Sequence, residues 1–129
     1  MIPGRSNDHP SMKKSFLFAL QGFRMAVATE RNIKIMLVGG VLAILAGLIL
    51  RIDALSWCCV LLCCGGVIVT ELINTAIETV VDLVSPEFHP LAGRAKDIAA
   101  AASYTICFIS VLVGAIVYLR ALLILLGVI

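Results

Sequence analysis

The chain has 129 residues, of which 61% are hydrophobic and 14% charged, and its net charge is +2. Soluble globular domains carry about 25% charged residues, so this composition excludes an ordinary soluble protein. The small net charge gives no reason to expect a nucleic-acid partner. A chain this short forms one membrane-embedded domain, residues 1–129, and any large cavity is expected between copies of it. We therefore expect an all-α membrane protein that assembles into oligomers.

The first part of the chain is expected to be a tail followed by a surface helix. Residues 1–10 contain prolines, a glycine and short polar residues without any period, which predicts a mobile tail. Within residues 11–31, apolar side chains recur at three- and four-residue spacing opposite basic ones, which is typical of an amphipathic helix on a membrane surface. The alternative, a soluble packing helix, lacks a soluble domain to pack against.

Three long apolar segments follow, and each predicts a helix that crosses the membrane. Residues 33–50 are just long enough for one crossing. Residues 54–84 predict one long helix that leaves the bilayer before it ends. The Ser-Pro sequence that follows sets the C-terminal end of this helix. Residues 87–94 are expected to form a loop, and residues 98–120 the third span, with the last residues extending this helix.

The positions of the cationic residues predict the orientation of the chain. Eight of the ten lysines and arginines lie before or at the very start of the first span, or between the second and third, and only Arg51 and Arg120 remain for the other side. Under the positive-inside rule this places the N-terminus in the cytoplasm and the C-terminus outside. No pattern of a cleavable signal peptide is visible, so the first span should be retained.

Small side chains are frequent in the predicted spans. Gly39, Ala43 and Gly47 recur every fourth residue, which indicates close helix contact or, alternatively, a lipid-facing surface. Cysteines within apolar sequence suggest a metal or redox site, but thiolates are disfavoured in lipid, so we interpret them as packing residues without disulfides. The five cysteines are Cys58, Cys59, Cys63, Cys64 and Cys107.

Polar residues follow the apolar part of the second span. Glu71, Asn74, Glu78 and Asp82 fall within about 80° of one another on an α-helix. Carboxylates are costly beside hydrocarbon and repel one another, so a cation is expected to offset them. Mg²⁺ prefers carboxylate oxygen and is held by one or two carboxylates with substrate phosphates, and Glu30 could supply a second ligand. Alternatively, these acids merely solvate a cytoplasmic helix face, above all at Asp82.

The sequence after this stripe is also rich in polar groups. Glu87, His89, Arg94, Lys96 and Asp97 lie close together, and the cationic ones could hold phosphates. The P-loop sequence and the motifs of protein kinases are absent. These residues alone predict a metal and phosphate site at the cytoplasmic edge of the membrane.

Two stretches resemble a known family. "ELINTAIETVVDLVSPEFHPLAGRAKD", which begins at Glu71, resembles the signature of the prokaryotic diacylglycerol kinase and undecaprenol kinase family, and "FALQGFRMAVATERNIKI", residues 18–35, is similar to its N-terminal region. The resemblance covers residues 13–120. It implies a homotrimer with active sites shared between neighbours, located in the bacterial inner membrane. It also implies transfer of the γ-phosphate of MgATP to the hydroxyl of a membrane lipid.

The resemblance also implies roles for individual residues. Glu71 is the general base, Asn74 orients the base or the lipid head group, and Glu30 and Glu78 hold the metal. Arg24 and Ala100, with Glu71, belong to the lipid site. The residues implied in nucleotide binding are Lys14, Phe18, Glu30, Glu78, Asp82, Glu87, His89, Lys96 and Asp97.

The chain departs from the family pattern near the start of the surface helix. Ser11 and Phe18 stand where a basic residue and a tyrosine contact nucleotide in diacylglycerol kinases, with Lys13 or Lys14 as the candidate replacement. The sequences "ALQG" and "ERNIKI" and the alanine run after "AKD" look more like undecaprenol kinases, so undecaprenol is the favoured lipid. The alternatives are diacylglycerol as substrate, a non-catalytic module that binds a cation or partner, and, less well supported, a small transporter.

Overall fold

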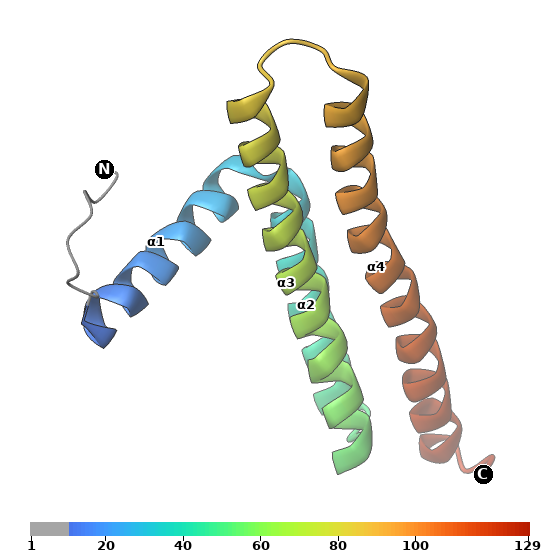
Figure 1. Cartoon of the computed structure of the whole chain (residues 1–129). Coiled ribbons are helices and arrows are strands. Elements are labelled where there is room, and N and C mark those ends of the chain that lie inside the picture. Colours follow the sequence, from blue (N-terminus) through green and yellow to red (C-terminus); the bar gives the residue numbers. More distant parts are fainter. Residues whose placement is uncertain (1–10) are drawn as a thin grey trace.

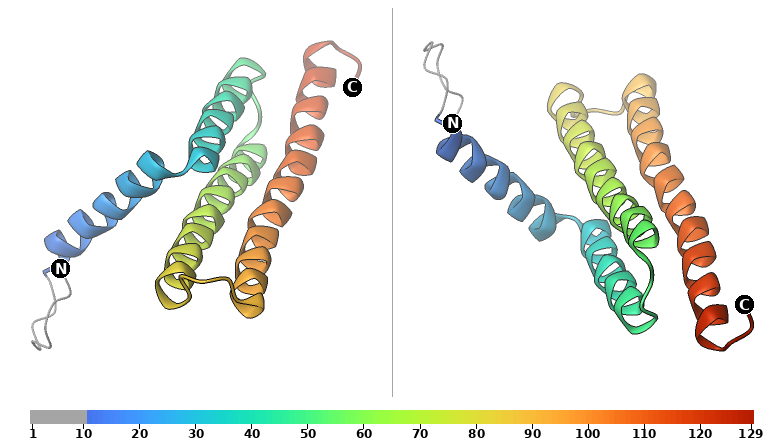
Figure 2. Two further views of the ribbon diagram at one scale, coloured as in Figure 1. Left: turned by 90° about the horizontal axis from the view of Figure 1, so that it is seen from above. Right: turned by 90° about the horizontal axis from the view of Figure 1, so that it is seen from below.

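The computed structural model describes residues 11–129, which form four α-helices (Figures 1 and 2). The expected tail, residues 1–10, lies outside this range. No β-strand occurs among the described residues, and three helices are long and apolar enough to cross a membrane. The prediction of an all-α membrane protein with three spans is thus confirmed. The helices are α1 (Met12–Thr29), α2 (Arg31–Ile49), α3 (Ala54–Val84) and α4 (Pro90–Leu125).

Helix α1 leaves the three-helix bundle at an angle and packs little against it (Figure 1). It ends at Thr29, two residues before the expected end, because Glu30 adopts extended backbone with φ −94° and ψ 125°. This residue separates α1 from α2 and lets the two axes diverge. Phe16 and Leu20, which lie one turn apart on the apolar face, are 71% and 37% exposed, as expected for an amphipathic helix whose apolar face contacts lipid.

Helices α2 and α3 form a hairpin through a tight turn. Arg51 has a positive φ of 51°, and the carboxylate of Asp53 accepts a hydrogen bond from the Ser56 N–H at 3.0 Å and so caps α3. Gly47 lies directly against the Trp57 ring and the Ile52 side chain. Of the small-residue stripe, Gly47 therefore makes a close contact, whereas an added Cβ at Gly39 would meet open space.

Helix α3 is longer than α2 and positions the polar stripe. Its 31 residues give about 46 Å of helix, against about 28 Å for the 19 residues of α2. The hydrocarbon core of a bilayer is about 30 Å thick, so α3 must project beyond it. In Figure 1, α3 and α4 both continue past the start of α2 at the end where a loop joins them.

Helix α4 differs from the prediction. It begins at Pro90 and not at residue 98, so the loop is confined to residues 85–89 and the segment 90–97 is helical. Proline is favourable in the first turn, where its missing N–H has no helical partner, and the His89 Nδ1 accepts a hydrogen bond from the Leu91 N–H at 3.2 Å. At its other end the helix continues to Leu125, so the last residues extend it past the predicted span, as expected.

One chain buries little of its apolar surface. Among the described residues, the buried apolar side chains are only Ala26, Ile33, Ile52, Val60 and Ala99. Most large apolar side chains on all three spans are exposed. In water this surface would cause aggregation, but in a bilayer it can face lipid or other copies of the chain.

The close contact at Gly47 predicts a cost for adding a methyl group. A Cβ there would lie 2.9 Å from the Trp57 ring and 3.0 Å from Ile52, so Gly47→Ala should lower stability by about 1–3 kcal/mol through overpacking. Gly39→Ala is the matched control in the same helix and should have little effect. Thermal unfolding in detergent measures both. Equal melting temperatures for the two variants would contradict the close packing of this hairpin.

The hairpin end of the bundle carries an ion pair. Arg120 donates to the Asp53 carboxylate at 2.8 Å and so links α4 to the α2–α3 turn. The pKa of Asp53 is lowered from 3.8 to about 2, first by the Ser56 backbone N–H and then by Arg120. Because the folded state has the lower pKa, this stabilisation is complete above about pH 4 and is lost as the pH falls through about 2.

Asp53→Asn keeps a capping side chain and removes the charge. We expect the variant to melt below the wild type at pH 7 and pH 5 by the same difference, because Asp53 is ionised at both values. The difference should shrink between pH 4 and pH 2. Melting curves of the two proteins in one detergent measure this. A difference that stays constant down to pH 2 would show that the charge of Asp53 does not stabilise the fold.

Candidate functional site

The buried polar side chains of the described residues gather in one place. They are Glu71 and Asn74 on α3 and Ser103 on α4, which are 3%, 7% and 3% exposed. Burial of a carboxylate without partners is costly, so its surroundings must provide compensation. Their position on two facing helices identifies the part of the bundle where polarity is concentrated.

Each of these residues takes part in a side-chain hydrogen bond. The Ser103 hydroxyl donates to the Glu71 Oε2 at 2.6 Å, across the α3–α4 interface. One turn further along α3, the Asn74 Nδ2 donates to the Glu78 Oε1 at 3.0 Å. The Asn74 Oδ1 is buried and has no hydrogen-bond partner. A buried acceptor without a hydrogen-bond donor indicates a place where a bound molecule would supply that donor.

These side chains line a cavity of about 320 Å³. The wall from α2 comes from its first two turns, directly after the junction with α1. The cavity therefore lies where the amphipathic helix meets the first span, at the level expected for the membrane edge. The lining residues are Asn32, Ile35, Met36, Glu71, Asn74, Glu78, Ala100, Ser103, Tyr104 and Cys107.

Four of the predicted site residues meet in this cavity: Glu71, Asn74, Glu78 and Ala100. Those on and after α1 do not line it. Lys14, Phe18 and Arg24 are exposed on α1, and Glu30 is half-buried at the α1–α2 junction. Within one chain, the two acids expected to hold the metal, Glu30 and Glu78, are thus not both on the cavity wall.

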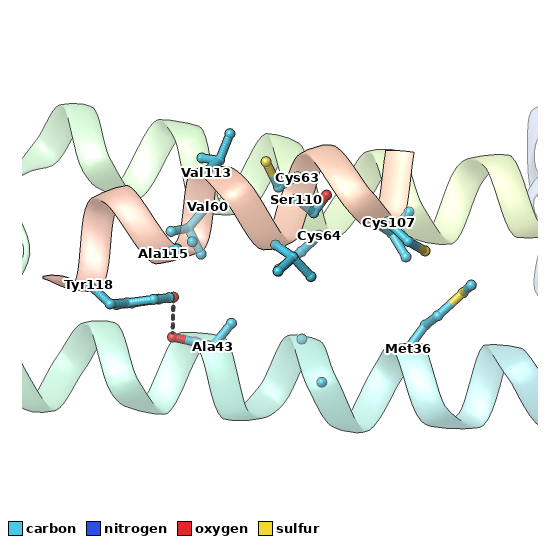
Figure 3. Close-up of a pocket in the computed structure, with 15 residues that line it drawn as sticks. Met36, Ala43, Val60, Cys63, Cys64, Cys107, Ser110, Val113, Ala115 and Tyr118 are labelled. Carbon is cyan, nitrogen blue, oxygen red and sulfur yellow. Dashed lines mark hydrogen bonds between the residues drawn. The ribbon is translucent and has the colours of Figure 1, made fainter. Parts of the chain in front are cut away.

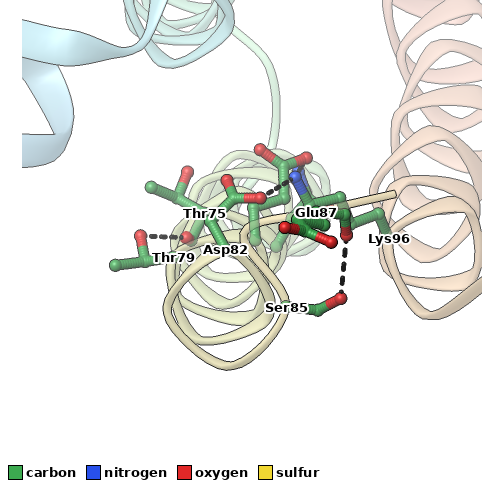
Figure 4. Close-up of polar contacts among 8 residues, drawn as sticks. Thr75, Thr79, Asp82, Ser85, Glu87 and Lys96 are labelled. Carbon is green, nitrogen blue, oxygen red and sulfur yellow. Dashed lines mark hydrogen bonds and ion pairs between the residues drawn. The ribbon is translucent and has the colours of Figure 1, made fainter. Parts of the chain in front are cut away.

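The remaining predicted residues lie beyond the cavity, at the ends of α3 and α4. Lys96 and Asp82 form an ion pair at 2.5 Å between these helices (Figure 4). His89 caps α4, and the Ser85 hydroxyl donates to the Glu87 carbonyl at 3.0 Å. The Glu87 and Asp97 side chains are exposed. Two of the groups predicted to contact nucleotide are therefore engaged with each other.

Ser103 was not predicted as a site residue. A serine or threonine in a span usually bonds to a carbonyl of its own helix, as Thr105 does to Ala101 at 2.8 Å. Ser103 instead reaches the neighbouring helix. The only signal in the sequence is a serine directly after an alanine run, and the partner depends on how α3 and α4 face each other. Asn32, Tyr104 and Cys107 were missed for the same reason.

The cavity wall offers the kind of oxygen that a hard cation binds. Among residues 11–129, no three His, Cys, Asp or Glu side chains converge on one point. Mg²⁺ does not need such a group, because one or two carboxylates together with substrate phosphates hold it in many enzymes. Glu78 on this wall provides an oxygen ligand of this type. The residues present thus fit a magnesium ion that is bound together with a phosphate compound.

Comparison with known proteins decides the family. The family model described as prokaryotic diacylglycerol kinase matches residues 17–118. The chain belongs to this family. The matched range contains every predicted site residue except Lys14. The resemblance inferred from the two sequence stretches is confirmed, and with it the interpretation as a lipid kinase of the membrane.

Each of the individual relatives carries one of two enzyme names, undecaprenol kinase or diacylglycerol kinase. The chain is 36% identical over 109 residues to an undecaprenol kinase of Bacillus subtilis, an alignment that covers 84% of this chain and 89% of the relative. It is 39% identical over 115 residues to a diacylglycerol kinase of Synechocystis, covering 88% of this chain and 66% of the relative. A diacylglycerol kinase of Helicobacter pylori is 33% identical over 101 residues, covering 78% and 79%.

The bond between Ser103 and Glu71 predicts a loss of stability in Ser103→Ala. Without the hydroxyl, a buried carboxylate loses its donor, which costs about 1–3 kcal/mol. Ser110→Ala is the matched control on the same helix, because the Ser110 Oγ is buried without a partner and its removal should be neutral or stabilising. Thermal unfolding in detergent compares them. A melting temperature for Ser103→Ala equal to that of Ser110→Ala would contradict the bond.

Proposed function

We propose that the chain transfers the γ-phosphate of ATP to the hydroxyl of undecaprenol, with diacylglycerol as the alternative acceptor. The observation that carries this proposal is the buried carboxylate of Glu71 in a cavity at the level of the α1–α2 junction. Undecaprenol is favoured because the Bacillus subtilis relative is named an undecaprenol kinase, and the alignment covers 89% of that relative.

In this proposal Glu71 takes the proton from the lipid hydroxyl as its oxygen attacks the γ-phosphorus of ATP. Phosphoryl transfer needs little covalent help from a protein, so placement of the hydroxyl in line with the leaving group is the main task. Ser103 occupies one oxygen of the carboxylate, which leaves the other for the substrate. The unpaired Oδ1 of Asn74 could accept a hydrogen bond from the lipid head group.

The charged groups of the reaction would be held toward the cytoplasm. Glu78 and Glu30 would hold Mg²⁺ together with the nucleotide, and when bound this ion offsets the charge of the phosphate oxygens. Lys96 would exchange its contact with Asp82 for a phosphate. The further nucleotide contacts proposed are Lys14, Phe18, Asp82, Glu87, His89 and Asp97, and Arg24 and Ala100 complete the lipid site.

We also propose a homotrimer in the bacterial cytoplasmic membrane, with the N-terminus inside. None of the residues that line the Glu71 cavity within 11–129 of one chain is a lysine or arginine, and Glu30 does not line it either. A neighbouring copy could supply these groups. The exposed apolar surface of the three spans provides area for such contacts.

A direct assay tests the lipid. Purified protein in nanodiscs receives labelled ATP with either undecaprenol or diacylglycerol at equal mole fraction. We expect phosphate transfer to both, with the higher kcat/KM for undecaprenol. Higher kcat/KM for diacylglycerol would reverse the choice of substrate, and no transfer to either lipid would refute the kinase proposal.

The role of Glu71 is tested by Glu71→Gln, which keeps the shape and the acceptor for Ser103 but removes the base. Turnover should fall roughly 10²- to 10⁴-fold, the usual contribution of general base catalysis, with the oligomer intact. Asp53→Asn, the same change at the other end of the bundle, should retain turnover. A non-catalytic module would instead show altered assembly or no change. Kinetics and size-exclusion chromatography together separate these outcomes.

A further inference from the structure

The Ser103 hydroxyl donates to another helix, although a partner within its own helix is the usual one. It reaches the Glu71 Oε2 on α3 at 2.6 Å. Both side chains belong to residues that are 3% exposed, so water has little access to either group. By contrast, four threonine hydroxyls among the described residues bond to the carbonyl four positions earlier, namely those of Thr29, Thr70, Thr79 and Thr105. The bond of Ser103 therefore replaces a local one and connects two helices at the cavity.

Glu71 depends on Ser103 for the orientation of its carboxylate. Within residues 11–129, Ser103 is the only hydrogen-bond donor to this side chain, because the nearby Asn74 amide donates to Glu78. A glutamate side chain has three rotatable bonds, so without a donor its carboxylate could adopt several orientations. The bond selects one of them. It also leaves the Glu71 Oε1 without a partner among the described residues, beside the cavity that Glu71 and Ser103 both line.

Contacts on both sides of Ser103 fix α4 against the other helices. Seven residues before it, Lys96 pairs with Asp82 near the end of α3. Fifteen residues after it, the Tyr118 hydroxyl donates to the Ala43 carbonyl of α2 at 2.7 Å, as Figure 3 shows. Ser103 thus lies between two polar contacts on one continuous helix. Its short side chain is a fixed point to which the longer glutamate side chain can be held.

We infer that Ser103 is a positioning residue for the general base, and that its hydroxyl holds Glu71 with Oε1 toward the bound lipid alcohol. This inference rests on the proposed function, because it needs Glu71 to take the proton. In the reaction the proton of the alcohol moves to Oε1 while the alcohol oxygen forms a bond to the γ-phosphorus. The bond from that phosphorus to the bridging oxygen breaks, and ADP leaves. Ser103 keeps its own proton throughout.

The first test compares Ser103→Thr with Ser103→Val, which have nearly the same shape, although only threonine keeps the hydroxyl. With undecaprenol and labelled ATP in nanodiscs, we expect kcat of the threonine variant within about threefold of wild type. For the valine variant kcat should fall roughly tenfold, with each KM changed less than about twofold, because placement of the base is lost and not binding. Equal kcat values for the two variants would overturn the inference.

Ser110→Ala is the control on the same helix. The Ser110 hydroxyl lies about two turns further along α4 (Figure 3) and is buried without a partner. Its removal should leave kcat at the wild-type level. A loss of kcat equal to that of Ser103→Val would show that any buried hydroxyl of α4 matters in the same way, which would overturn a specific role of Ser103.

The decisive measurement repeats the substitution in a protein without the base. In Glu71→Gln there is no base to position, so adding Ser103→Val should change the residual kcat by less than about twofold. A purely structural role predicts otherwise, because a loss of folded enzyme lowers turnover by the same factor in both backgrounds. An equal factor would therefore overturn the inference. If Ser103→Val does not assemble by size-exclusion chromatography, the smaller Ser103→Ala replaces it in the same cycle.

The outcomes also separate this inference from the proposed function. If Glu71→Gln retains wild-type turnover, Glu71 is not the base, and the proposed role of Glu71 fails together with the inference. If Glu71→Gln loses turnover while Ser103→Val keeps it, Glu71 remains the base and only the positioning role of Ser103 is wrong.

Discussion

The structure depends on a carboxylate that is buried between two helices long and apolar enough to span a membrane. Glu71 has lost almost all contact with solvent, and it accepts a hydrogen bond from Ser103 on the facing helix. A carboxylate in such a place destabilises the fold unless its oxygens have partners. It is therefore a residue whose presence stability alone does not explain, and the role of general base proposed for it would provide the reason.

Much of the fold and part of the site could be predicted from the sequence, because both follow from helical periodicity. The 3.6-residue repeat places Glu71, Asn74 and Glu78 on one face, and the structure shows these three on one cavity wall. The predicted start of α4 was wrong because Pro90 was interpreted as a loop residue, although proline is favourable in the first turn of a helix. The partner of Ser103 was missed because it depends on the facing of two helices, which no local pattern contains.

A single chain lacks part of what phosphoryl transfer needs. The Glu71 cavity has acids, amides and two hydroxyls on its wall, but within the described residues of one chain it has no cationic side chain to offset phosphate charge. Lys96 lies only four residues before the cavity residue Ala100, but its ammonium group is paired with Asp82. At the same time, the spans expose most of their apolar side chains. Assembly of several copies would meet both needs, since it buries apolar surface and brings side chains of one chain to the cavity of another.

Exposure along α3 shows how one helix can join an apolar and an aqueous reactant. Glu71 and Asn74 are 3% and 7% exposed, Glu78 is half-buried, and the Asp82 side chain is 64% exposed. These residues lie on one face of the helix and span about 16 Å along its axis. Side-chain exposure therefore increases along α3 from Glu71 to Asp82. In the proposed reaction, a lipid hydroxyl would approach the buried end without leaving its leaflet, while a nucleotide would reach the exposed end from water. Because the spacing between the two ends is fixed by the helix, only the reactants need to move to bring a phosphate to the hydroxyl.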